Sequence, residues 1–272
     1  MYKLTAIDID GTLLNDKDQL LPGVKSALEE AVEAGHMVVL CTGRGPSALK
    51  SVQDLFDFDM PFICYHGAVI VQGKDGKILY QQKMNTADVI GICKEGTKRD
   101  VTMHLWTMDG TLAVSRIDPF SEYYIQKTHT PVNQVVLFDE NSPILKEDIA
   151  KMMFHAEPNT IDRYLKECES FTKDMNINYN TSQPIFLEFI DKDVSKANAI
   201  QALIQQYHIK QEEVIAIGDG LNDLPMIEYA GLGVAMGNAK DYIKNAAQYI
   251  APTNNEEGVA EVINRFVLGK LK

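Results

Sequence analysis

The sequence predicts an α/β protein with a doubly wound parallel sheet and a second, α+β domain inserted into the chain. Three observations predict this class. Short apolar strands alternate with amphipathic helices in the first and last thirds of the chain, a rhythm typical of parallel sheets. The middle third has hairpin turns instead. The length of 272 residues leaves room for two modest domains.

In the first third, residues 4–9 and 37–41 are apolar runs of strand length. The stretch 22–34 between them has helical spacing, with Pro22 in the first turn and Gly35 as a C-terminal stop. A helix, a strand and a hairpin are expected to follow at residues 46–56, 62–65 and 69–82. This order indicates a parallel sheet covered on both faces.

From residue 84 a helix and two strands joined by a turn replace this alternation, and a second such cycle follows. These elements are expected at residues 87–98, 101–106, 112–115, 149–155 and 158–168, with two short strands ending at 186–190. The earlier rhythm then resumes, with elements expected at 196–207, 214–217, 224–229, 232–235 and 259–268. We therefore predict a core of residues 1–83 and 191–272 and an inserted domain of residues 84–190.

Charge and hydropathy argue against several kinds of partner. There are 26 Lys and Arg against 38 Asp and Glu, a net charge of −12 with no basic block, which disfavours nucleic acid and anionic membranes. No apolar run approaches the ~20 residues of a membrane span. Asp8 and Asp10 stand where a secretion signal would be apolar. The four cysteines lack zinc-site spacing. We therefore expect a cytoplasmic protein that binds neither nucleic acid nor anionic membranes.

Two acids follow the first predicted strand, in Asp8-Ile9-Asp10-Gly11-Thr12. Open α/β sheets bind ligands at this end of their strands, and Gly11 lets the chain turn so that both carboxylates can face one site. Two acids there suit Mg²⁺, and one of them could also act as a nucleophile. The alternative is an ordinary Asp-Gly turn.

A second copy of the same string bears on that alternative. Asp109-Gly110-Thr111-Leu112 repeats it, but Thr107 stands where the first acid should be. This copy predicts a plain hairpin turn.

Two further segments suit a phosphate group. Thr42-Gly43-Arg44 follows the second strand and offers a hydroxyl, a backbone N–H and a guanidinium. Lys196 begins a helix, whose free N–H groups favour anions. Taken singly, these residues are also consistent with a surface turn and an exposed lysine.

A third loop resembles the first in chemistry. Gly218-Asp219-Gly220-Leu221-Asn222-Asp223 follows the strand at 214–217. Two acids and an amide on a glycine-rich turn form a second half of a metal site. The alternative is a turn whose acids are simply solvated.

These motifs stand in the order Asp-x-Asp, Thr-Gly-Arg, Lys, Gly-Asp-x-x-Asn-Asp, each at a strand end or helix start of one sheet. In them the sequence resembles the haloacid dehalogenase (HAD) superfamily, and within it the Cof-like, YidA-type sugar phosphatases. The resemblance runs through the whole chain, including Leu187-Glu188 and residues 226–236. It implies a Rossmann-like, HAD-like catalytic core, with residues 84–190 as the substrate-specificity cap.

The resemblance also implies a mechanism. Asp8 would attack phosphorus, while Asp10 would protonate the leaving oxygen and then activate water. Mg²⁺ would be held by Asp8, Asp219 and the backbone carbonyl of Asp10, with Asp223 orienting these ligands. The phosphoryl oxygens would be held by Thr42, Gly43, Lys196 and Asn222, with Arg44 joining them or reading the outer part of the substrate.

One position departs from the family pattern. Relatives usually have Asn-Gly-Ala after the third strand, where this chain has His66-Gly67-Ala68. His66 either contacts substrate or is a partly buried loop residue.

We predict a Mg²⁺-dependent phosphatase of small phosphorylated metabolites, with sugar phosphates as the expected class, acting through an aspartyl-phosphate. Two alternatives stay open. One is a phosphoryl transferase or mutase on the same scaffold, and the other is a regulatory phospho-acceptor resembling a receiver domain. The sequence identifies neither the sugar nor the oligomeric state.

Overall fold

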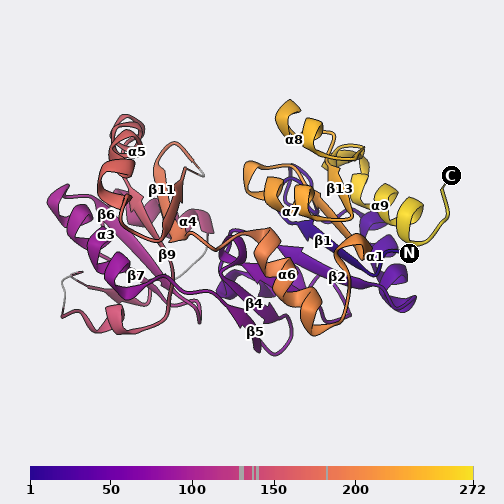
Figure 1. The fold of residues 1–272 in the computed structure, drawn as a ribbon, viewed down its shortest axis with the longest axis horizontal. Helices are drawn as coiled ribbons and strands as arrows, with labels where there is room; N and C mark the ends of the chain where they lie inside the picture. The colour runs from indigo at the N-terminus through magenta and orange to yellow at the C-terminus, as the bar shows by residue number, and fades with distance from the viewer. Residues whose placement is uncertain (129–131, 137, 139–140, 182, 272) are drawn as a thin grey trace. The chain divides into compact units, whose positions relative to one another are not determined.

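The computed structural model describes residues 1–128, 132–136, 138, 141–181 and 183–271 (Figure 1). The chain divides into two compact units. The core unit comprises Met1–Arg44, Leu49–Tyr80 and Ser195–Lys272, and the cap unit comprises Gly45–Ala48 and Gln81–Val194. These divisions lie three and four residues from the expected boundaries at 83 and 190, and the grouping of 45–48 with the cap unit was not anticipated.

The core unit contains an eight-stranded sheet in the order β14-β13-β12-β1-β2-β3-β4-β5. Its strands are β1 (Leu4–Asp8), β2 (Met37–Cys41), β3 (Pro61–Cys64), β4 (Val69–Gln72), β5 (Ile78–Gln81), β12 (Val214–Gly218), β13 (Leu232–Ala235) and β14 (Tyr249–Ile250). All the pairings from β14 across to β3 are parallel, and β4 runs antiparallel to β3. The first and last thirds of the chain therefore complete one sheet, as predicted.

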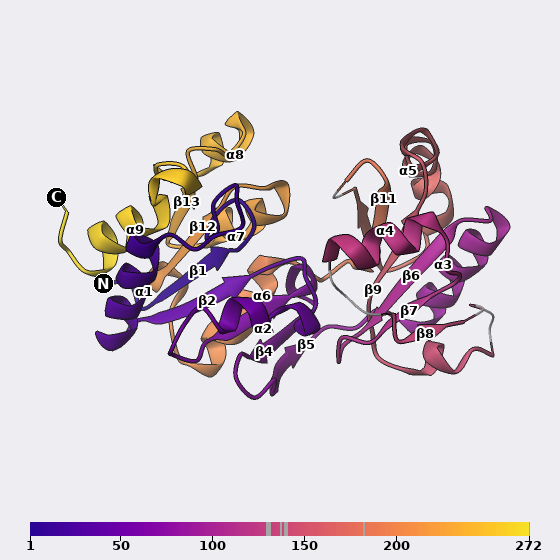
Figure 2. The same ribbon diagram turned by 180° about the vertical axis from the view of Figure 1, so that it is seen from behind.

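Helices cover both faces of this sheet. They are α1 (Pro22–Glu33), α2 (Lys50–Gln53), α6 (Lys196–Gln206), α7 (Leu224–Tyr229), α8 (Asp241–Ala246) and α9 (Gly258–Val262). On one face, Leu203 of α6 and Met226 of α7 are buried in one cluster with Leu4 and Val39 of the sheet. Figures 1 and 2, seen from opposite sides, show α6 on this face and α1 on the other. The predicted doubly wound class is confirmed.

Three core segments differ from the prediction. Residues 46–56 form a 3-10 turn at Pro46–Ala48 and the short α2 instead of one helix. Gln53 donates from Nε2 to the carbonyl of Phe58 at 2.8 Å, so the chain turns early while the apolar side chains stay buried. The C-terminal helix changes to a wider π turn at Ile263–Val267. The helix α8 and strand β14 were missed because they are too short to show a period.

The cap unit contains a six-stranded sheet in the order β10-β11-β9-β6-β7-β8. Its strands are β6 (Thr102–Thr107), β7 (Leu112–Val114), β8 (Gln134–Val135), β9 (Ile149–His155), β10 (Ile177–Asn180) and β11 (Phe186–Asp191). The pairings are antiparallel except β7 with β8. Helices α3 (Thr86–Lys98) and α5 (Pro158–Thr172) contribute Ile92 and Ile161 to a buried cluster with Phe154 and Phe189 of the sheet. This is the predicted α+β pattern.

A further helix, α4 (Pro119–Thr128), packs against the sheet through aromatic contacts and was not predicted. The ring of Tyr124 lies 5.1 Å from that of His104 and 5.3 Å from that of Trp106. The contacting residues of α4 are aromatic and do not repeat over several turns, so no helical period marked them.

Two sequence expectations concern the described residues as a whole. All four cysteines are buried and carry free thiols. None of the helices in the described part of the chain is long and apolar enough to cross a membrane.

Candidate functional site

The site lies at the edge of the core sheet where four adjacent parallel strands end. β12, β1, β2 and β3 are neighbours, and the chain order reverses between β12 and β1, where open α/β sheets bind ligands. Asp8 is the last residue of β1, Thr42 follows β2, and Asp219 follows β12. Parallel pairing therefore brings the motifs of the first and last thirds of the chain together.

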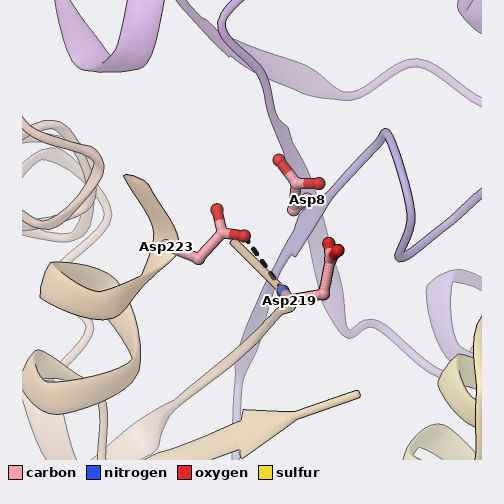
Figure 3. A group of neighbouring side chains, drawn as sticks. All are labelled: Asp8, Asp219 and Asp223. Atoms are coloured by element: carbon pink, nitrogen blue, oxygen red, sulfur yellow. Dashed lines mark hydrogen bonds between the residues drawn. The ribbon is translucent and has the colours of Figure 1, made fainter. Parts of the chain in front are cut away.

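Three carboxylates meet at this edge. One oxygen of each of Asp8, Asp219 and Asp223 lies within 4.8 Å of the other two, and Figure 3 shows the three side chains converging. Asp223 accepts from the backbone N–H groups of Asp219 at 3.0 Å and Gly220 at 2.9 Å, which folds its own loop back. Asp223 thus stabilises the loop after β12 and also belongs to the group of three carboxylates.

A buried ammonium group joins two of these acids. Lys196 has 0% exposure, and its Nζ donates to Oδ1 of both Asp8 and Asp223. Ser195 immediately precedes Lys196 and caps the N-terminus of α6, where its Oγ accepts from the N–H of Asn198 at 3.1 Å. Burial alone would oppose the charge, but the carboxylates of Asp223 and Asp8 raise the pKa of Lys196 above its ordinary value. Lys196 is therefore a buried cation and not an exposed lysine.

The three carboxylates of the site carry more negative charge than the single ammonium of Lys196 can balance. Burial raises the pKa of Asp8 well above its ordinary value, and the negative charge of Asp223 adds to the effect. Burial also raises the pKa of Asp219, again with a contribution from Asp223. Carboxylate oxygens that lie close together with one ammonium between them fit a hard divalent cation. The residues present are thus suited to Mg²⁺.

Asp10 stands apart from the acidic group. Its carboxylate is exposed and pairs with Arg44, whose Nε lies 3.0 Å from Oδ2 while Nη2 contacts Oδ1. The backbone N–H of Arg44 donates to Oγ1 of Thr42 at 3.0 Å. The guanidinium that was expected to reach phosphate or substrate is therefore engaged with Asp10 in this state.

The remaining predicted residues lie close by. Thr42 is buried, and Gly43 faces the ring of His66. Nδ1 of His66 lies 3.5 Å from Nδ2 of Asn222. Within the core unit, the predicted site residues thus come from four strand ends and from the start of α6.

Sequence reasoning overlooked two contributors. Oγ1 of Thr12 donates to Oδ1 of Asp219 at 2.8 Å, and Nδ2 of Asn238 donates to the carbonyl of Gly11 at 2.8 Å. Thr12 could have been predicted, because it lies next to the two acids of the first motif and has a hydroxyl that can donate to a carboxylate. Asn238 lies in the loop after β13 and carries no motif of its own.

Comparison with known proteins agrees with this geometry. The family model for haloacid dehalogenase-like hydrolases matches residues 5–263. The "Putative phosphatase YxeH" of Bacillus subtilis (strain 168) is 34% identical over 99% of this chain and 100% of its own length. The crystal structure of TM0651 from Thermotoga maritima superposes with a TM-score of 0.86, 27% identity and 98% coverage of both chains.

A solved structure of the HAD subclass IIB sugar phosphatase BT4131 has a TM-score of 0.80 and 25% identity, covering 99% of this chain and all of the other. The chain therefore belongs to the haloacid dehalogenase-like hydrolases, and it is an enzyme of the phosphoric monoester hydrolase class.

Proposed function

We propose that this protein is a Mg²⁺-dependent phosphatase that hydrolyses small phosphorylated metabolites, sugar phosphates among them, through an aspartyl-phosphate on Asp8. The observation that carries the proposal is the buried Lys196, which contacts the carboxylates of Asp8 and Asp223 beside Asp219. Because a buried charge needs partners, Lys196 stays buried and charged only while it is paired with these carboxylates. Here it keeps a nucleophilic carboxylate and a cation at one point where a phosphoryl group would be attacked.

The metal would be held by Asp8, Asp219 and the backbone carbonyl of Asp10, with Asp223 keeping Asp219 in place through its loop bonds. Thr12 holds Asp219 from the other side. When bound, Mg²⁺ offsets the charge of the carboxylates and of the phosphoryl oxygens. The raised pKa values of Asp8 and Asp219 are consistent with a site that needs such a cation.

In the first chemical step, an oxygen of Asp8 forms a bond to phosphorus while the bond from phosphorus to the leaving oxygen breaks. Asp10 gives a proton to that leaving oxygen. In the second step, Asp10 takes a proton from water, the water oxygen bonds to phosphorus, and the bond to Asp8 breaks. Inorganic phosphate leaves and both acids return to their starting states.

Two groups of residues support this chemistry. Arg44 holds both oxygens of the Asp10 carboxylate before the substrate arrives, and it has to release one of them when Asp10 carries the proton that it donates. The phosphoryl oxygens would be held by Thr42, Gly43, Lys196 and Asn222. Cationic and N–H donors of this kind stabilise the charge that develops during transfer.

We assign substrate selection to the cap unit, with sugar phosphates as the class to test first. The sugar phosphatase BT4131 matches the chain over almost its whole length, cap included. The cap would recognise the hydroxyls of the substrate's neutral part, while the core unit holds the phosphate. The cytoplasmic location expected from the sequence stays a prediction.

The test is release of inorganic phosphate from a panel of phosphorylated metabolites. The panel includes sugar phosphates, polyol phosphates and an aryl phosphate, each measured with Mg²⁺, with Ca²⁺ and with a chelator. We expect substantial turnover with Mg²⁺ and none with the chelator. Ca²⁺ should compete with Mg²⁺ and support little turnover, because it readily binds both oxygens of one carboxylate and would occupy the nucleophile.

Three results would change the assignment. Transfer of phosphate to a second hydroxyl would make the protein a transferase or mutase. A phosphorylated protein without turnover would favour a regulatory phospho-acceptor. Equal turnover with Ca²⁺ would remove Asp8 as nucleophile in favour of attack by water.

A further inference from the structure

We propose that the turn Tyr65–Gly67, with His66 at its centre, is a positioning element that fixes the phosphate-binding loops of this site relative to one another. The inference rests on the proposed function of the core unit. The turn follows β3 and includes none of the acids or the lysine of the site. It nevertheless touches each of the loops that supply the phosphate-binding residues.

The first contact is to the loop after β2. The N–H of Tyr65 donates to the carbonyl of Arg44, and the N–H of His66 donates to the carbonyl of Thr42, both at 3.0 Å. These backbone bonds fix the loop that carries Thr42, Gly43 and Arg44. They do so without using any side chain of the turn.

The second contact is made by the imidazole ring. A Cβ added to Gly43 would lie 2.5 Å from Cε1 of His66, so the ring packs directly over that glycine. On its other side, Nδ1 lies 3.5 Å from Nδ2 of Asn222. The ring thus lies between a loop after β2 and a loop after β12, two strands that β1 separates in the sheet.

The third contact is to the start of α6. Gly67 has φ +118°, and a Cβ there would lie 2.2 Å from the carbonyl oxygen of Ser195 and 3.1 Å from the backbone nitrogen of Lys196. Only a glycine allows this approach. The turn therefore also limits where Lys196 can sit.

The backbone of the turn is strained. Tyr65 has φ 49° and His66 has φ 61°, and two successive residues other than glycine rarely adopt the left-handed region. Strain of this kind persists only where the surroundings impose it, and it clusters at functional sites. The contacts described above supply that constraint.

These observations separate His66 from the catalytic residues. It would act through Asn222 and Gly43, by setting the distance between donors from two loops. Misplacement of groups by ~1 Å can cost ~10²-fold in rate. Loss of the ring should therefore affect phosphate binding and turnover more than it affects folding.

His66→Gly is the decisive variant, because it removes the ring and also relieves the left-handed strain. We expect kcat/KM for an aryl phosphate to fall by ~10²-fold, within the range for misplaced catalytic groups. The affinity for inorganic phosphate, measured by calorimetry with Mg²⁺, should fall as well. The Tm of His66→Gly should stay at or near that of the wild-type protein. His66→Asn is the conservative variant, since Asn tolerates this backbone and can accept from Asn222, and it should restore most of both properties.

A double-mutant cycle with Asn222→Ala tests the route of the effect. Because His66 sets the distance between Asn222 and the loop of Gly43, His66→Gly should cost clearly less in the Asn222→Ala background than in the original chain. Fully additive losses, or unchanged kcat/KM and phosphate affinity in His66→Gly, would overturn the proposal. Phosphate affinity is measured without turnover, so the positioning role is tested even if the unchanged protein hydrolyses none of the panel substrates.

Discussion

The string Asp-Gly-Thr-Leu occurs once in each unit, and the two copies have different roles. Asp10-Gly11-Thr12-Leu13 follows β1 of the core unit, and Asp109-Gly110-Thr111-Leu112 follows β6 of the cap unit. Both glycines have a left-handed φ, +85° in the core copy and +93° in the cap copy. The local backbone requirement is therefore shared, and the difference lies in what surrounds each turn.

The cap copy satisfies its polar groups within itself. Asp109 accepts from Oγ1 of Thr107 and from the N–H of Thr111 at 3.0 Å, and these bonds lower its pKa. The N–H of Thr107 donates to the carbonyl of Thr111 at 3.1 Å, and the chain continues into the antiparallel strand β7. The predicted hairpin turn is confirmed.

The core copy directs the same groups to distant partners. Thr12 donates to Asp219, Asp10 pairs with Arg44, and Asp8, which aligns with Thr107 of the cap copy, contacts Lys196. β1 has parallel neighbours on both sides, so its end opens toward loops from other strands. A short string thus specifies a turn, while the strands beside it specify the chemistry.

The largest expected effect is at the aligned first position. Asp8→Asn should reduce turnover to below about a hundredth of the original rate, because an amide is a poor nucleophile and a weak Mg²⁺ ligand. Thr107→Val, at the matching cap position, should leave kcat unchanged. Phosphate release by both purified variants is the measurement. Substantial activity in Asp8→Asn would contradict the covalent mechanism.

The second acid offers a matched pair of variants. Asp10→Asn should lower kcat for an alkyl phosphate by ~10²–10⁴-fold, as expected for lost proton transfer, and should affect an aryl phosphate less because its leaving group needs no proton. Asp109→Asn should keep full activity with both substrates. Equal losses for the two substrates in Asp10→Asn would argue against its role as the acid.

The threonines of the two copies should differ more modestly. Thr12→Val removes the hydroxyl that holds Asp219, so the Mg²⁺ concentration for half-maximal activity should rise ~10–100-fold, the usual range for groups that orient metal ligands. Thr111→Val should leave that concentration unchanged. Titration of activity with Mg²⁺ measures both. A fall in kcat at saturating Mg²⁺, with unchanged metal dependence, would place Thr12 elsewhere in the mechanism.

The last expected effect is on the stability of the cap unit in acid. Burial lowers the pKa of His104 to about 3 and that of His155 to about 4, and Asp118 opposes both shifts. The charge of His155 further lowers the pKa of His104. The unfolded chain binds more protons below pH ~6.5, so stability present at neutral pH is lost as the pH falls. At pH 5 each histidine should cost up to about 2 kcal/mol.

Hydrogen exchange at pH 7 and pH 5 tests this expectation. Protection of β6 and β9 in the cap unit should fall more than protection of β1 and β2 in the core unit. His104→Phe keeps the aromatic contacts and should reduce the difference. The same pH dependence in that variant would exclude His104 as its source.

Much of the fold could be read from periodicity. The strands at Met37–Cys41, Ile149–His155 and Leu232–Ala235 and the helix at Leu224–Tyr229 have the predicted bounds, because each is a complete apolar run or repeat between clear stops. The helix α4 and the break after α2 could not be read in this way. The first is held by aromatic contacts with β6, and the second by a side-chain bond from Gln53 to Phe58.

By itself, the sequence determined the class of fold, the order of the motifs and the chemical types that each strand end presents. These follow from local spacing, which needs no knowledge of neighbours. The tertiary structure decided which partners those groups meet: Lys196 buried between Asp8 and Asp223, Arg44 engaged with Asp10, and His66 packed over Gly43 and against Asn222. Such contacts join residues far apart in the chain, so their geometry exists only once parallel pairing has aligned the strand ends.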